Sequence, residues 1–229
     1  MHVVFPWRTW LTGALFVCAG LGTAAHFLLG MDYVGSGRTA VGVASFLALV
    51  FTATPVWRML WWFRPVRDRL PLLDGDWSGE VTSNWTVISA LRAAAKQAGD
   101  PPIDVDNLNQ PLPALGAVRI EARIRATFFG IELALHSSDS LYQQSRLRAV
   151  VLKPAKDGYP AVLDYLFEAR VLEPVGGDSS CFDGAGSLTV KVEDQRIVLE
   201  GPTWTNRSWT RGMNTAGVIR LNRTSALGS

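Results

Sequence analysis

The sequence predicts an N-terminal hairpin of two transmembrane helices, followed by an antiparallel, all-β, up-and-down barrel of about eight strands. Three observations indicate this fold class. Two long uncharged apolar segments lie near the N-terminus, four tryptophans and four arginines occur together between Trp57 and Trp77, and most of the chain beyond alternates between apolar and polar residues. We therefore assign residues 1–64 to the hairpin and residues 65–229 to a cytoplasmic barrel domain.

The first apolar segment runs from Thr9 to Met31 without a formally charged side chain, and the second runs from Thr39 to Trp57. At about 1.5 Å of rise per helical residue, each segment is long enough to cross a hydrocarbon core of about 30 Å. A cleaved signal peptide is a poor alternative for the first segment, because the run is long and a second span follows after one short turn. We expect two antiparallel helices that are neighbours.

The arginines on either side of the two spans predict their orientation. Arg8 precedes the first span, and four arginines follow the second one before Pro71. Basic residues collect on the cytoplasmic side of a membrane, so both termini are expected in the cytoplasm, as in a multi-pass membrane protein. Tryptophan and arginine are also the side chains that settle where hydrocarbon meets water, so the stretch from Trp57 to Trp77 is expected at the membrane edge.

Small residues recur at four-residue spacing in both spans: Ala14, Cys18 and Gly22 in the first, and Ala40, Ala44 and Ala48 in the second. Such ridges let helix backbones approach closely, which drives helix association in lipid. Alanine and glycine are also simply common in transmembrane helices, so the pattern has two interpretations. The functional one is a hairpin that packs on itself and then on further copies of itself.

The remainder of the chain alternates with a period of two. Between Val118 and Ala126, apolar residues alternate with arginine and glutamate, which is typical of a strand with one buried face. Similar alternation recurs in GIELAL, LDYLFEARV, GSLTVKVE, RIVLEG and GVIRLNR. With a strand starting at Trp77 and another between SSDS and VVLK, the count reaches about eight, enough for a small barrel that holds side chains or one small ligand.

Residues 86–116 depart from this pattern, because a short alanine-rich helix precedes a proline-rich run without periodicity. We expect this segment to be an insertion between the first two strands. It is either a lid over the mouth of the barrel or a passive surface loop.

Composition limits the function. After residue 64 the chain has 18 basic and 19 acidic residues, which argues against binding of DNA or RNA polymers through a basic face but leaves room for a pocket with one or two arginines. Two distant cysteines, Cys18 and Cys181, do not form a disulfide framework and fit a reducing compartment. Three scattered histidines and the lack of known catalytic motifs predict no metal, no cofactor and no enzymatic activity.

Two places in the barrel sequence are candidates for special roles. GDWSGE opens the first strand with a glycine and a tryptophan, as in lipocalin-like barrels, so Trp77 is expected to plug the closed end beneath a late-strand arginine. Trp204, Thr205, Asn206 and Arg207 place a flat aromatic ring, a hydroxyl, an amide and a guanidinium at the end of a late strand. These groups suit a planar base and a phosphate, although strands also carry them for packing.

The two-span hairpin and the segments LPLLDGDWSGEV, SSDS, LDYLFEA, GAGSLTV and LEGPTWTNRSWTRGMNTAGVIRL resemble, in this order, the membrane-anchored β-barrel effectors of bacterial CBASS anti-phage operons. The resemblance implies that the barrel binds a cyclic dinucleotide made by a cognate nucleotidyltransferase. It further implies that the chain oligomerises and that its spans disrupt the bacterial inner membrane, causing abortive infection. The resemblance also implies that the following residues bind the ligand: Trp204, Thr205, Asn206, Arg207, Tyr165, Ser138 and Ser140.

Two alternatives stay open from the residues alone. One is a membrane-tethered, lipocalin-like carrier or scaffold for an apolar ligand, and the other is an assembly protein whose barrel is filled by its own side chains. An apolar lumen without arginine would favour the carrier, whereas Arg207 pointing inward beside Trp204 would favour the nucleotide.

Overall fold

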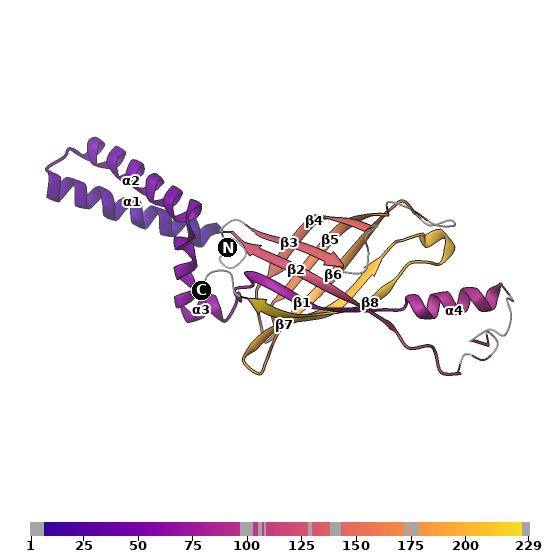
Figure 1. Ribbon diagram of the computed structural model, residues 1–229. Coiled ribbons are helices and arrows are strands. Elements are labelled where there is room, and N and C mark those ends of the chain that lie inside the picture. The colour runs from indigo at the N-terminus through magenta and orange to yellow at the C-terminus, as the bar shows by residue number, and fades with distance from the viewer. Residues whose placement is uncertain are drawn as a thin grey trace. The chain divides into compact units, whose positions relative to one another are not determined.

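A computed structural model describes residues 7–96, 103–104, 107, 109–127, 130–137, 143–171, 174 and 179–225. The chain divides into two compact units, one formed by residues 1–72 with 127–130 and the other by residues 73–126 with 131–229. The first unit is helical and the second is a β-barrel, and both can be followed by colour in Figure 1.

The helical unit begins with α1 (Trp7–Leu29) and α2 (Tyr33–Ala53), both long and apolar enough to cross a membrane. The prediction of two apolar N-terminal helices is confirmed. Asp32 starts α2, because its side chain accepts a hydrogen bond of 3.2 Å from the backbone N–H of Gly35. His26, at the end of α1, lies 2.7 Å from the carbonyl oxygen of Met31 and stacks on Tyr33, so it stabilises the turn.

Small residues line part of the contact between α1 and α2. Ala40 and Ser36 are buried, and a Cβ placed on Gly22 would lie 3.6 Å from the Cβ of Ala40. Ala25 is also buried. The remaining members of the two predicted ridges differ in burial: Cys18 and Ala44 are partly buried, whereas Ala14 and Ala48 are exposed.

The second helix ends at Ala53, and Thr54 caps the 3-10 helix η1 (Pro55–Trp62) that follows. The short helix α3 (Arg64–Arg67) comes next. The indole of Trp61 packs edge-on against Trp57, at 5.3 Å between centroids, and donates to the carbonyl of Leu70 at 2.8 Å. Trp62 is exposed, whereas Trp57 is buried.

The second unit is a single antiparallel sheet in the order β3-β2-β1-β8-β7-β6-β5-β4, which curves into a nearly closed barrel (Figure 1). Its strands are β1 (Gly75–Ser83), β2 (Gly116–Ala126), β3 (Ile131–Ser137), β4 (Gln143–Lys153), β5 (Val162–Val171), β6 (Cys181–Glu193), β7 (Arg196–Thr205) and β8 (Ala216–Ser225). The predicted eight-stranded up-and-down barrel is confirmed. The edge strands β3 and β4 lie side by side, but no ladder joins their described residues.

The barrel core consists of the inward alternate residues of the strands. Ile124, Leu163, Leu188, Leu199 and Leu221 are fully buried, and each comes from a different strand. Burying such a side chain contributes about 1.5–3 kcal/mol. The core thus forms a band around the barrel and leaves its two ends to other side chains.

Trp77 lies at one end of the barrel and is 1% exposed. Its indole donates to the carbonyl of Leu73 at 3.0 Å, and the guanidinium of Arg223, on the last strand, lies 5.6 Å from its ring centroid. Burial lowers the pKa of Arg223, and the charge of Asp74 opposes this shift. Asp74 itself accepts a hydrogen bond of 2.9 Å from the N–H of Ala126, so polar partners secure this end.

The segment between β1 and β2 contains α4 (Trp85–Ala95), which extends beyond the other end of the barrel (Figure 1). Asn84, just before it, pairs with Ala216 through two hydrogen bonds of 2.9 and 3.0 Å. Thr86 donates to the carbonyl of Ala114 at 2.6 Å, which fixes the return of the chain towards β2. Arg92 contacts Met213 in the connection between β7 and β8, so α4 supports that connection.

Candidate ligand-binding cavity

A cavity of about 460 Å³ lies in the barrel near the end from which α4 extends. This volume falls within the range of about 300–1,000 Å³ that small-molecule sites occupy. Apolar side chains form much of the lining, including Val81, Ile120, Leu133, Leu135, Leu147 and Ile219, while Ser83, Ser137, Ser145, Thr203, Thr205 and Thr215 add hydroxyls. No described residue of α4 lines the cavity.

Two glycines of β6 make room for the aromatic wall of the cavity. Tyr165 faces Gly186 and Phe167 faces Gly184 across the β5–β6 ladder. A Cβ at either glycine would lie only 2.4 Å from the Tyr165 ring or 2.2 Å from the Phe167 ring, so each ring lies over a position that only glycine leaves free. The two rings stack on one another at 6.0 Å and offer a broad aromatic surface.

Tyr165 is 4% exposed, and its hydroxyl lies 3.4 Å from Oγ1 of Thr203. Burial raises the pKa of Tyr165 to about 12, while the hydrogen bond to Thr203 acts in the opposite direction. The phenol therefore stays neutral at physiological pH. It keeps a donor and an acceptor for a bound molecule.

The segment from Trp204 to Arg207 does not face the cavity as a unit. Thr205 lines it and shares a hydrogen bond of 2.9 Å with Thr215. Trp204 also belongs to the lining, yet it is 48% exposed and alternates with the inward Thr203 and Thr205, so its indole lies on the outer face.

Asn206 and Arg207 lie beyond the last residue of β7. The side-chain oxygen of Asn206 accepts a hydrogen bond of 2.7 Å from the N–H of Asp183, and its own N–H donates to the carbonyl of Asp183 at 2.9 Å. The guanidinium of Arg207 lies over Phe182 at 5.5 Å and over Trp85 at 6.0 Å. Neither residue lines the cavity.

The structure thus brings Tyr165, Thr205 and part of Trp204 to one cavity and uses Asn206 and Arg207 to hold the neighbouring chain connections. Ser138 and Ser140 lie outside the described residues. Most other lining residues were not singled out from the sequence, among them the two basic ones, His136 on β3 and Arg146 on β4. Both occupy exposed positions of strands that alternate between apolar and polar residues, so no sequence signal separates these two from ordinary surface positions.

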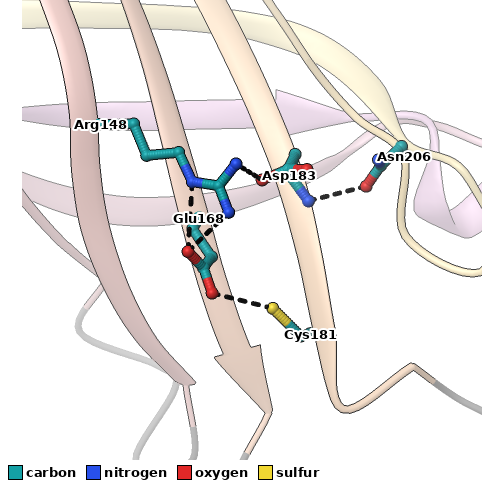
Figure 2. A network of polar contacts seen from close by, with 5 residues as sticks. All are labelled: Arg148, Glu168, Cys181, Asp183 and Asn206. Atoms are coloured by element: carbon teal, nitrogen blue, oxygen red, sulfur yellow. Dashed lines mark hydrogen bonds and ion pairs between the residues drawn. The ribbon is translucent and has the colours of Figure 1, made fainter.

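A polar network crosses β4, β5 and β6 on the outer face of the barrel (Figure 2). Arg148 donates to Glu168 at 2.7 Å and lies 3.2 Å from Asp183. Hydrogen bonding to Arg148 lowers the pKa of Glu168, and the hydrogen bond to Glu168 raises the pKa of the Cys181 thiol. A thiol with a raised pKa is a poor nucleophile, and the hydrogen bonds and ion pairs of the network join the three strands.

The Arg148–Glu168 pair predicts a pH dependence of stability. Because the folded-state pKa of Glu168 lies below its ordinary value of 4.5, the contribution of the pair is complete above pH 4.5 and is lost as the pH falls below it. We expect Arg148→Gln to lower the melting temperature at neutral pH and to have a shrinking effect in acid. Thermal melts across the acid range test this, with the exposed Arg125→Gln as control. A difference that stays constant in acid would contradict it.

The fold and the cavity define a class of protein: a small antiparallel β-barrel with a ligand-sized cavity, preceded by two apolar helices of membrane-spanning length. Among curated proteins, the chain is similar to CD-NTase-associated protein 15 of Escherichia albertii. The two are 23% identical over 197 residues, which cover 85% of this chain and 84% of the relative. No family model and no solved structure matches the sequence.

Proposed function

We propose that this protein is a membrane effector of bacterial anti-phage immunity of the CBASS type. In this proposal the barrel binds a cyclic dinucleotide made by a cognate nucleotidyltransferase, binding triggers oligomerisation, and the apolar hairpins then disrupt the inner membrane and cause abortive infection. The relative, by its name, is associated with a CD-NTase, and the similarity extends over most of both chains. The observation that carries the proposal is the cavity of about 460 Å³ in a barrel joined to two apolar helices.

The lining of the cavity suits a nucleotide. Tyr165 and Phe167 form a flat surface against which a base can stack, an interaction worth about 1–3 kcal/mol per base. The surrounding hydroxyls of Thr203, Thr205 and Thr215 can donate to, or accept from, the base edges and the sugar. An aromatic wall with several neutral hydrogen-bonding groups is therefore the chemical basis for recognition.

In this proposal, ligand binding leads to membrane disruption through oligomerisation. A ligand shifts an equilibrium only if it binds one state more tightly than the other, so the ligand-bound barrel must favour contact with further copies. Once barrels gather, the local concentration of hairpins rises. The small residues Ala14 and Ala48, which are exposed in a single chain, then offer close-approach surfaces to neighbouring hairpins.

The proposal is tested by thermal unfolding of the full chain in detergent with a panel of cyclic dinucleotides. A ligand present at about 100 times its dissociation constant stabilises the folded state by about 2.7 kcal/mol, so at least one member should raise the melting temperature by several degrees. The same bases supplied as nucleosides serve as the control and should have little effect. A panel in which no member shifts the transition would count against nucleotide binding.

A second candidate function is supported by the same cavity. Much of its lining is apolar, and Arg207 lies outside it, which favours a membrane-tethered carrier or scaffold for an apolar ligand. Displacement of a fluorescent fatty acid from the full chain tests this alternative. Tight binding of the fatty acid, together with no response to cyclic dinucleotides, would favour the carrier.

A further inference from the structure

The cavity reaches the outer surface between β3 and β4. On β1 and β5 only alternate residues line it, such as Tyr165 and Phe167, as expected when one face of a strand points inward. On β3, by contrast, every residue of 133–137 lines the cavity, and on β4 every residue of 145–147 does so. Both faces of the two edge strands therefore border the cavity.

This pattern distinguishes the gap between β3 and β4, which we call the seam, from the rest of the cavity wall. Strands β7 and β8 also contribute consecutive lining residues, but only near Thr205, where β7 ends, and Ala216, where β8 begins. At β3 and β4 the sheet has its two edges, and no ladder joins their described residues. The cavity is thus open along the seam, and a bound molecule can contact both edges.

Two basic side chains stand at this seam, His136 on β3 and Arg146 on β4. Among the residues that the structure describes, they are the only histidine, lysine or arginine residues in the lining. Both are exposed. An anionic group that enters the cavity from the seam meets them without crossing the apolar core.

Several arginines of the barrel are held in ion pairs, but Arg146 is not among them. Arg148 is held by Glu168 and Asp183, Arg123 by Asp76, and Arg220 by Glu193 and Glu200. No ion pair between described residues involves Arg146 or His136. Their nitrogen donors are therefore available to a ligand at a lower cost than those of the paired arginines.

We propose that His136 and Arg146 form the anion-binding edge of the cavity and hold a phosphate of the bound ligand across the β3–β4 seam. The identity of the ligand rests on the proposed function. A guanidinium donates paired hydrogen bonds to phosphate oxygens, and an imidazole donates an N–H in either tautomer. The bases then lie deeper, against Tyr165 and Phe167.

This placement also gives the ligand a structural effect. Because one basic residue lies on each edge strand, a phosphate that both residues contact connects β3 to β4. The connection closes the seam, which is the one break in the ladders between the described strands. It thereby provides two arrangements of the barrel between which a ligand can select.

The test measures binding of cyclic dinucleotides to the full chain in lipid nanodiscs by calorimetry, with a panel that covers all pairings of adenine, guanine, cytosine and uracil. The variants are Arg146→Gln, His136→Gln and the control Arg125→Gln, which alters an exposed arginine of β2 outside the lining. We expect Arg146→Gln to weaken binding of the best member about 10- to 100-fold and His136→Gln to weaken it less, with the control unchanged. Arg146→Lys, which keeps the charge, should recover part of the loss.

Salt provides a second readout that a merely structural role would not change. Binding by the unaltered chain should weaken as the salt concentration rises, and binding by Arg146→Gln should depend less on salt. If Arg146→Gln binds as tightly as Arg125→Gln, with the same salt dependence, the anion-binding edge is refuted and the proposed function stands. If no member of the panel binds the unaltered chain, both proposals fail.

Discussion

Trp77→Ala is expected to destabilise the barrel by about 3–5 kcal/mol, the cost of truncating a large buried aromatic side chain. The substitution removes an indole that is 1% exposed, the hydrogen bond to Leu73 and the ring beneath Arg223. Since the free energy of unfolding of a domain is only about 5–15 kcal/mol, this substitution would remove much of the stability of the barrel.

Chemical denaturation followed by circular dichroism measures the effect of Trp77→Ala on the β-signal. Trp209→Ala is the matched control, because this tryptophan is 68% exposed and its loss should change stability by no more than about 0.5 kcal/mol. Equal midpoints for the two variants would contradict the role of Trp77 in closing the barrel.

Removal of residues 1–64 is expected to abolish killing of the host cell. Without α1 and α2 the chain loses both segments that are long and apolar enough to enter a membrane, while the residues that line the cavity all remain. Under the proposed function, cells that produce a cognate nucleotidyltransferase together with the shortened chain should grow like cells that lack this chain. Colony counts after induction measure this.

The control for the truncation is a full chain with Trp62→Phe, an exposed position in η1, which should still kill. Its expression level must match that of the truncated chain, so that a loss of killing reflects the missing hairpin and not a missing protein. Cell death caused by the truncated chain would refute the membrane mechanism and leave the binding proposal to be judged separately.

The sequence predicted the fold well, because apolar length and alternation are local properties. Two uncharged runs marked α1 and α2, and the alternation from Val118 to Ala126 is the alternation of β2. The tryptophan of GDWSGE lies beneath an arginine of the last strand at one end of the barrel. Such features follow from burial of one face of each element.

The candidate site was less predictable, because it depends on strand order and on the direction of single side chains. Asn206 and Arg207 follow Thr205 directly in the sequence, yet β7 ends there and the chain turns to pair with Asp183 and to stack on Phe182. His136 and Arg146 are ten residues apart, and only the open seam between β3 and β4 brings both to the cavity. Neither arrangement can be predicted from the local sequence pattern.

The room inside the barrel has a recognisable cause in the sequence, the glycines of GAG in β6. Gly186→Ala is therefore a direct probe of the cavity, since the added Cβ would lie 2.4 Å from the Tyr165 ring and drive that ring into the space for the ligand. Gly130→Ala is its matched control, because a Cβ there meets nothing within 4 Å.

Equilibrium dialysis of a radiolabelled cyclic dinucleotide against the full chain and these two glycine variants tests the central claim most directly. The claim predicts saturable binding to the full chain and to Gly130→Ala, and at least tenfold weaker binding to Gly186→Ala. Binding that Gly186→Ala retains at full strength would place the ligand outside the cavity and would contradict the role of the barrel interior as the receptor site.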